Sequence, residues 1–290
     1  MVLVVGSTGQ LGRAIVRRLR QDGMAIRALV RPTSSVSILH GLGAEIVVGD
    51  LRDPESLRRA CRRCDAMVTT ASSLHSGFDF ERIDRAGNLN LIEAARQEHI
   101  GHFVFTSTVG ADVPDAPRIF KNKKFIEERL AASGLRYTIL RPAGFMENLV
   151  PLIRWALRTG WAIIPSPGMR KTSYIAIRDI AEMVRMVLAS APAGHRIIEF
   201  GGPEDLSMLD CMALLQEALG RRIRLWRVPL GLLRLLGKMA RLFSQAPDAV
   251  LEIVEFVERK GLRADKSFLS EFPIPLTSFR SFLSEQLKRG

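Results

Sequence analysis

The first twelve residues constrain the fold of this chain more than any other feature. An apolar run at 2–5 leads directly into Gly6-Ser-Thr-Gly9-Gln-Leu-Gly12, and a segment with apolar residues at helical spacing follows. In such a strand–turn–helix the first glycine allows a tight turn, the second lets an anion approach backbone N–H groups, and the third lets the helix pack on the strand. The sequence therefore predicts a site for the pyrophosphate of a dinucleotide. The residues expected to form it are Gly6, Thr8, Gly9, Gln10, Leu11 and Gly12.

The rest of the first 150 residues alternates short apolar runs with amphipathic helical segments. Buried parallel strands read as nearly continuous apolar runs, and the helices between them cover both faces of the sheet. The pattern predicts an α/β fold of the Rossmann type, with a doubly wound parallel sheet over residues 1–150. Its strands are expected at 2–5, 25–30, 45–48, 66–69, 103–105 and 137–140.

After residue 150 the alternation loosens, and prolines punctuate shorter elements. We expect residues 151–290 to form a smaller substrate or interaction lobe, interleaved with the first domain, at the carboxyl edge of the sheet, because open α/β sheets bind their ligands there. Within this lobe, Asp179 is expected to be the N-cap of a helix, since Glu182 follows it at the spacing of a capping box.

Composition and charge exclude several classes of protein. Hydrophobic residues make up 47% and charged residues 25%, which is ordinary for a globular domain and argues against disorder. No apolar run approaches a membrane span, and the three cysteines provide no disulfide framework, so we expect a cytoplasmic protein. Cys61 and Cys64 are expected to be ordinary residues of a helix at 54–64. The net charge of +12 arises from clusters on different expected helices without interleaved aromatic residues, so we expect no specific nucleic-acid partner.

The end of the second expected strand indicates which dinucleotide binds. NAD-binding domains place an acidic residue there for the ribose 2′-hydroxyl, and residues 24–36 contain none. Arg31, followed by hydroxyl residues that include Ser35, instead suits a 2′-phosphate, because a guanidinium presents a fork of donors to phosphate oxygens. We therefore expect NADP as the cofactor in preference to NAD. Further cofactor contacts are expected after the third and fourth strands, from Asp50, Leu51, Ala71 and Ser72.

Several segments, in the same order along the chain, match the pattern of a known family. They are 6–12, 30–31, 49–51, 83–88, 103–108, Lys123 with Glu127, and 137–142 through Phe145 and Asn148. Together they resemble the atypical short-chain dehydrogenase/reductase family, in its NmrA-like branch with the isoflavone-reductase-like enzymes. The likeness extends to 174–180 and is loose over the last 70 residues. It implies a Rossmann fold, an NAD(P) cofactor, and chemistry carried by a hydroxyl at the end of the fifth strand and a Tyr-x-x-x-Lys pair.

The catalytic pair of that family is incomplete in this chain. If Lys123 is the motif lysine, the tyrosine position holds Ile119. The missing phenol acid argues against ordinary alcohol–ketone chemistry, although isoflavone-reductase-like members also lack the tyrosine and keep the lysine. The resemblance implies Lys123, Ser107 and Thr108 as catalytic residues, and Thr106, Lys123, Pro142 and Phe145 as cofactor contacts.

The helix that carries Lys123 supports a role for it without the resemblance. Ile119, Ile126 and Leu130 form one apolar stripe, and Lys123 falls within it. Burying an unpaired ammonium is costly, so Lys123 needs a partner, and a cofactor ribose with a reacting carbonyl would supply one. The alternative is a surface ion pair with Glu127, four residues further on.

Two functions remain open from the sequence. The first is NADP(H)-dependent reduction of a small-molecule substrate, an apolar carbonyl, enone or quinone compound, in which Lys123 stabilises the developing enolate or donates a proton. The second is non-catalytic NADP(H) binding by a redox sensor or an assembly or scaffold protein. A basic amphipathic helix expected at 230–243 could make a peripheral membrane or protein contact. Alternatively, it covers the substrate pocket and buries its apolar face in the lobe.

Overall fold

The computed structural model describes residues 1–74, 79–190, 195–240 and 246–288. Its centre is a seven-stranded sheet of order β3-β2-β1-β4-β5-β6-β8, in which every neighbouring pair is parallel. This confirms the predicted α/β class and the doubly wound sheet. The strands are β1 (Val2–Val5), β2 (Ile26–Val30), β3 (Glu45–Val48), β4 (Ala66–Thr69), β5 (His102–Thr106), β6 (Tyr137–Pro142) and β8 (Arg196–Phe200).

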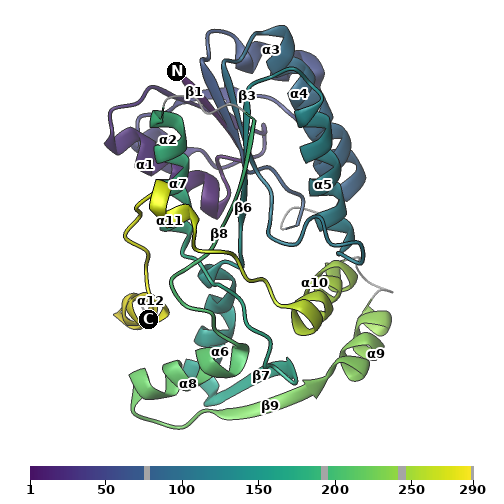
Figure 1. Cartoon of the computed structure of the whole chain (residues 1–290), viewed down its shortest axis with the longest axis vertical. Coiled ribbons are helices and arrows are strands. Elements are labelled where there is room, and N and C mark those ends of the chain that lie inside the picture. The colour runs from purple at the N-terminus through teal and green to yellow at the C-terminus, as the bar shows by residue number, and fades with distance from the viewer. Residues whose placement is uncertain (75–78, 191–194, 241–245, 289–290) are drawn as a thin grey trace.

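Helices cover both faces of this sheet (Figure 1). On one face α1 packs against α7, with α2 and α11 beside them, and on the other face lie α3, α4 and α5. Each layer buries its own apolar cluster, which explains why the central strands are apolar at successive positions. The bounds are α1 (Gln10–Gln21), α2 (Ser37–Gly41), α3 (Pro54–Cys61), η1 (Phe80–Gly87, a π-helix), α4 (Asn88–Gln97), α5 (Arg118–Ala131), α7 (Ile177–Ala189) and α11 (Phe268–Glu271).

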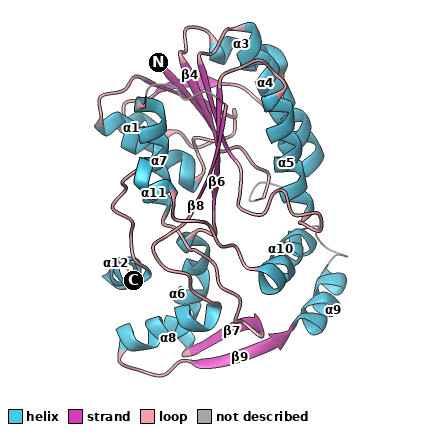
Figure 2. Ribbon diagram, viewed as in Figure 1, coloured by secondary structure: helices cyan, strands magenta, loops and turns pink. Residues whose placement is uncertain are grey.

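A smaller lobe lies beyond the carboxyl ends of the strands (Figures 1 and 2). There β7 (Trp161–Ser166) and β9 (Arg224–Pro229) form a parallel two-stranded sheet, whose inner side packs into one apolar cluster with α6 and α8. The chain after residue 150 does not stay in this lobe, because α7 and β8 return to the main sheet. The remaining elements are η2 (Met146–Leu149), α6 (Val150–Thr159), α8 (Met208–Leu219), α9 (Leu230–Ala240), α10 (Ala246–Lys260) and α12 (Phe279–Lys288).

The N-terminus of α7 differs from the sequence expectation. The helix begins at Ile177 with Ala176 at the N-cap, so the prediction that Asp179 is the N-cap is wrong. Glu147 of η2 takes the capping role, since both of its carboxylate oxygens accept the Ile177 amide at 3.1 Å. Asp179 is buried and accepts from the amide and the hydroxyl of Thr277 at 2.8 Å, which fastens the C-terminal segment to α7. Both contacts join residues distant in sequence, so no local pattern reveals them.

The segment around Cys61 and Cys64 is shorter than expected as a helix. α3 ends at Cys61, and Arg63 adopts a left-handed φ of 59°, so the prediction that the helix extends to residue 64 is wrong. All three cysteines of the chain are buried and free. Burial raises the pKa of the Cys61 thiol to about 12, which keeps it in the unreactive protonated form.

The basic amphipathic helix expected at 230–243 corresponds to α9. It ends at residue 240, and residues 241–243 lie outside the described part of the chain. Leu232 and Leu235 are exposed, so the alternative in which this helix buries its apolar face in the lobe is wrong for these two side chains. Over the residues that the structure describes, no helix combines the length and the apolar character needed to cross a membrane.

Candidate cofactor and active site

The glycine turn between β1 and α1 forms a closely packed cradle. Gly6 has a φ of 77°, and a Cβ there would lie 2.6 Å from Thr70 Oγ1. A Cβ on Gly12 would lie 2.2 Å from the Gly6 carbonyl oxygen, so the helix approaches the turn as only a glycine permits. Gly9 is the exposed N-cap of α1, where no side chain caps the helix. The first N–H groups of α1 are therefore open to an anion, which fits a dinucleotide pyrophosphate.

The side chains of this turn divide between the core and the surface. The Ser7 hydroxyl is buried and donates to the Leu29 carbonyl oxygen at 2.9 Å, which ties the turn to β2. Leu11 packs in the core between α1 and the sheet, so it can offer a ligand only its backbone N–H. Thr8 is half-buried and Gln10 is exposed, and both remain accessible.

The turn lies against the loop that follows β4. The strand order reverses between β1 and β4, and open α/β sheets bind their ligands at such a switch point. Thr70 donates to the Val5 carbonyl oxygen from its amide at 3.0 Å and from its hydroxyl at 3.2 Å, so the two loops are held together. Ala71 is buried and Ser72 is half-buried directly beyond this contact, beside the glycine turn.

The ends of β2 and β3 carry the residues predicted to meet the adenosine half of the cofactor. The Arg31 guanidinium is exposed and makes no hydrogen bond or ion pair with any residue that the structure describes, so it can receive a phosphate. Ser35 is exposed nearby in sequence. Asp50 accepts two hydrogen bonds from the Arg52 guanidinium at 2.9 and 2.6 Å, and this contact lowers the pKa of its carboxyl. Leu51 is half-buried against the apolar layer beside it.

Lys123 of α5 reaches the carboxyl end of β5. Its Nζ donates to the Thr106 carbonyl oxygen at 2.7 Å and lies 5.2 Å from the centroid of the Phe105 ring. Burial lowers the pKa of this ammonium group, and the negative charge of Asp84 partly offsets that effect. The alternative of a surface pair with Glu127 is wrong, because Glu127 is buried and pairs with a different cation.

Glu127 belongs to a buried network centred on Arg141 of β6, which sequence reasoning missed. Arg141 Nε and Nη2 donate to its two carboxylate oxygens at 2.8 and 2.5 Å, and Nη1 reaches Asp112 and Glu199 at 2.8 Å. The Ser107 hydroxyl donates to Glu127 at 2.5 Å. Its proton is therefore engaged in the network, and the catalytic role of Ser107 stays a prediction. An arginine within an otherwise apolar strand was the sequence signal for this network.

The remaining predicted residues border the same end of the sheet. Thr106 is buried, and its Oγ1 has no hydrogen-bond partner among the described residues. Thr108 is half-buried, Pro142 ends β6, and Phe145 is half-buried three residues further on. Ile119 is buried in the apolar cluster beneath α5. Both tyrosines of the chain are buried in other clusters, so neither supplies a phenol in place of Ile119.

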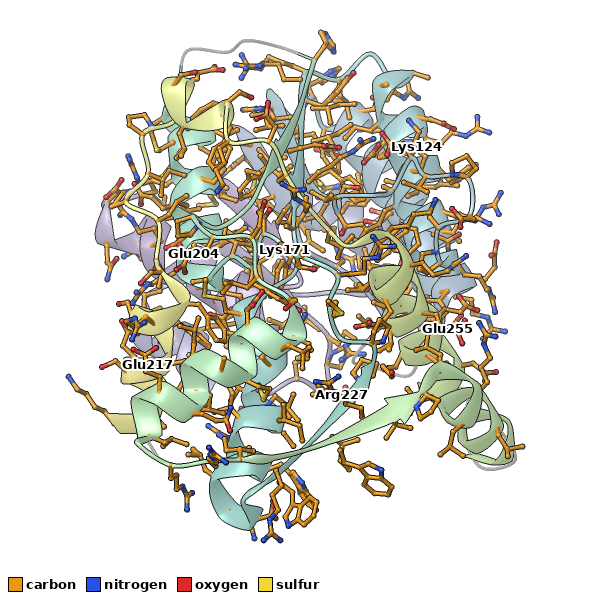
Figure 3. The ribbon with its side chains drawn as sticks, turned by 60° about the horizontal axis from the view of Figure 1, so that its bottom comes forward. Lys124, Lys171, Glu204, Glu217, Arg227 and Glu255 are labelled. Atoms are coloured by element: carbon orange, nitrogen blue, oxygen red, sulfur yellow. The ribbon has the colours of Figure 1, made fainter. Side chains whose placement is uncertain are left out.

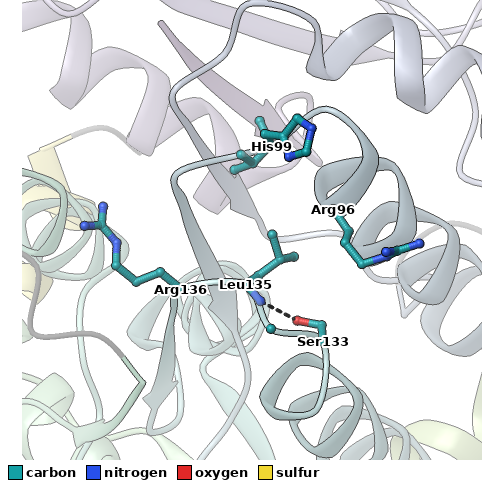
Figure 4. A pocket seen from close by; sticks show the side chains of 7 residues that line it. Arg96, His99, Ser133, Leu135 and Arg136 are labelled. Atoms are coloured by element: carbon teal, nitrogen blue, oxygen red, sulfur yellow. Dashed lines mark hydrogen bonds between the residues drawn. The ribbon is translucent and has the colours of Figure 1, made fainter.

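A surface hollow of about 390 Å³ lies at the opposite end of the sheet (Figure 4). Arg96, His99, Ser133, Leu135 and Arg136 are among the residues that line it, at the ends of α4 and α5 where β5 and β6 begin. It is therefore separate from the glycine turn and Lys123. In the described ranges of the chain, no group of side chains is arranged to hold a metal ion.

Comparison with known proteins agrees with this geometry. Residues 6–190 match the family model described as NAD(P)H-binding. The chain belongs to this NAD(P)H-binding family. One relative is the NAD(P)H azoreductase of Xenophilus azovorans, which is 31% identical over 225 residues that cover 77% of this chain and 76% of the relative.

Two further comparisons cover nearly the whole chain. The photosystem II assembly factor Ycf39 of Synechocystis sp. is 29% identical over 298 residues, 99% of this chain and 91% of the relative. The NADPH-dependent quinone oxidoreductase QOR2 of Escherichia coli, solved with NADPH, has a TM-score of 0.84 at 22% identity and covers 99% of this chain and 100% of that one. At this identity the likeness shows the fold. The structural neighbours lie in the NmrA-like, atypical short-chain dehydrogenase/reductase family, which confirms the resemblance predicted from the sequence.

Proposed function

We propose that this protein is an NADP(H)-dependent reductase of a small apolar carbonyl, enone or quinone compound. The observation that carries the proposal is the arrangement along the carboxyl edge of the sheet. There the glycine cradle lies at the β1–β4 switch point, and the half-buried Lys123 reaches the end of the next strand, β5. The azoreductase relative and the quinone oxidoreductase neighbour support a redox use of such a site.

The preference for NADP rests on Arg31. Its guanidinium is exposed and unpaired within the described residues, whereas the Asp50 carboxylate already forms an ion pair with Arg52. A free guanidinium beyond β2 favours a 2′-phosphate. We therefore expect NADPH to bind more tightly than NADH.

In this reaction bound NADPH would supply the hydride, and the chain would supply position and a proton. The Thr106 carbonyl oxygen takes one N–H of Lys123 Nζ, which leaves the other two for the oxygen of the acceptor. Because burial lowers its pKa, this ammonium gives up a proton more readily than an exposed lysine does. The proton passes from Nζ to the oxygen of the reduced acceptor, and Nζ regains a proton from water.

Fluorescence titration with NADPH and NADH, followed by NADPH oxidation with a series of quinones and enones, tests the proposal. Lys123→Met keeps most of the length of the side chain and removes the ammonium, and Lys121→Met changes an exposed lysine of the same helix. We expect kcat to fall about 100-fold or more for Lys123→Met, the scale of general acid catalysis, and to stay unchanged for Lys121→Met. Turnover that survives Lys123→Met would contradict the role of the lysine, and the absence of NADPH binding would contradict the proposal.

One observation favours the second function left open by the sequence. The match to Ycf39 of Synechocystis sp. extends over 99% of this chain, the lobe included, whereas the azoreductase match covers 77%. The alternative proposal is an assembly or scaffold protein that binds NADP(H) without turnover and contacts its partner through the lobe. Tight NADPH binding with no turnover on any acceptor would favour it. With either function, we propose a cytoplasmic protein.

A further inference from the structure

Two segments of the lobe carry much of the positive charge of this protein and all of its tryptophans. Residues 150–171 and 220–240 contain ten Lys and Arg residues and no Asp or Glu, in a chain of net charge +12. The three tryptophans of the chain, Trp155, Trp161 and Trp226, all lie in these segments. The segments form α6, β7, β9 and α9, which lie together at the end of the molecule remote from β1 (Figure 1).

The outer face of the β7–β9 ribbon is apolar and exposed. The register pairs Trp161 with Arg224 and Ile163 with Trp226, so these four side chains lie on the same side of the ribbon. Trp161, Ile163 and Trp226 are 44%, 43% and 58% exposed. The Arg224 guanidinium carbon lies 5.2 Å from the centroid of the Trp161 ring. Large apolar side chains and a cation are thus combined on one face that no described element covers.

The opposite face of the ribbon belongs to the core of the lobe. Ala162 and Ile164 are fully buried in the cluster that includes α6 and α8, so the ribbon is held firmly with its outer face toward solvent. Trp155 of α6 and Leu232 and Leu235 of α9 are also exposed on the elements that adjoin the ribbon. Large apolar side chains gathered on an exposed face are typical of an interaction site.

The basic residues at this end are largely free of acidic partners. Arg154, Arg158, Arg222 and Arg227 are exposed, and none forms an ion pair with a described residue. Figure 3 views this end and labels Arg227 on β9 and Glu255 on α10. On α9, Arg234 forms an ion pair with Glu255 at 2.5 Å. The surface therefore keeps a strong positive charge, which is complementary to an acidic partner.

We propose that the outer face of the β7–β9 ribbon docks on an anionic lipid bilayer. Trp161, Ile163 and Trp226 would enter the headgroup layer, where tryptophan is favoured, and the arginines around them would bind lipid phosphates. A bilayer with acidic lipids attracts such a surface over about a Debye length. The absence of carboxylates from both segments suits this partner, because a carboxylate held against it would be repelled. The proposal goes beyond the reductase function and does not depend on it.

The tryptophans make the test direct, because all three lie in the segments that form this end of the molecule. The full-length chain is mixed with vesicles of phosphatidylcholine, with or without phosphatidylglycerol, and its tryptophan emission and co-sedimentation are measured. We expect a blue shift and co-sedimentation with the phosphatidylglycerol vesicles, and the loss of both at high salt. Arg224→Gln should weaken partitioning about fivefold, the effect of removing one cation near an anionic surface.

Matched variants show which surface of the protein binds the vesicles. Trp226→Glu and Ile163→Glu should each abolish co-sedimentation, whereas Ile197→Glu, at a 49% exposed position of β8 in the main sheet, should leave it unchanged. NADPH titration and circular dichroism confirm that each variant is folded. Three results would overturn the proposal: no co-sedimentation of the parent chain, co-sedimentation that survives both ribbon variants, or a blue shift without vesicles that accompanies dimer formation. The last result would assign the face to a second copy of the chain. A parent chain that does not co-sediment with vesicles would leave an acidic protein as the partner.

Discussion

Glu127→Gln is expected to destabilise this protein far more than the loss of any exposed ion pair. Glu127 and Arg141 are 1% and 5% exposed, and both carboxylate oxygens accept from the guanidinium. Glutamine keeps the shape but turns an amide N–H toward a guanidinium N–H, so one buried donor loses its acceptor. Breaking a buried pair by removing one partner costs about 3–5 kcal/mol. Because Asp112 and Glu199 still contact Arg141, we expect about 3 kcal/mol.

Urea and thermal unfolding followed by circular dichroism measure this loss. A loss of about 3 kcal/mol corresponds to a Tm lower by about 6–12 °C for a large domain. The control is Glu128→Gln, at the neighbouring position, where the 61% exposed carboxylate lies 3.7 Å from Lys124 Nζ. An exposed pair of this kind contributes less than about 1 kcal/mol. If Glu127→Gln cost no more than Glu128→Gln, the reasoning that this buried pair holds α5 against β6 would be refuted.

Three further predictions concern the turn, the cofactor and pH. Gly12→Ala would bring a methyl group to 2.2 Å from the Gly6 carbonyl oxygen, so the turn must shift and NADPH titration should show an affinity lower by about tenfold or more. Gly41→Ala, where a Cβ meets nothing within 4 Å, should leave that affinity unchanged. Arg31→Ala should weaken NADPH binding by about tenfold to a hundredfold and spare NADH, and equal losses for the two would contradict the 2′-phosphate contact. Burial lowers the pKa of His102 from 6.5 to about 4, so below pH 6.5 the unfolded chain binds the proton more strongly. The Tm should therefore fall as the pH drops from 6.5 to 4, and His102→Gln should flatten that slope; an unchanged slope would assign it to other groups.

The strands of the main sheet before residue 150 were predictable to within one or two residues because their signal is local. Each is a short, mostly apolar run, with charged exceptions such as Arg27 and Glu45, and a run of this kind between amphipathic segments can be recognised without knowing its neighbours in the sheet. The seventh strand, β8, was not predicted, because Arg196 and Glu199 interrupt its apolar pattern. Those two side chains form ion pairs with Glu271 and Arg141, distant in sequence, so the reason for the charges lies in the tertiary structure.

The candidate site likewise has one part that was predictable from the sequence and one part that was not. The glycine turn was predictable, since each glycine is required by the backbone geometry within a few residues of it. The partners of Lys123 and Glu127 were not, although the apolar stripe correctly marked Lys123 as facing the sheet. A carboxylate on a helix can pair with any cation that the fold brings near. Helical spacing offered Lys123 as the alternative partner of Glu127, and the fold supplies Arg141.

The sequence by itself determined the Rossmann sheet, the dinucleotide turn and the placement of Lys123 at the carboxyl edge, because these follow from periodicity and from glycines that tolerate close backbone approach. Only the tertiary structure decided which charges are buried together and which apolar side chains stay outside. It placed Arg141 against Glu127 and left Trp161 and Trp226 uncovered on the β7–β9 ribbon. The physical reason is that burial and ion pairing depend on contacts between distant segments, whereas strand, turn and helix depend on neighbours along the chain.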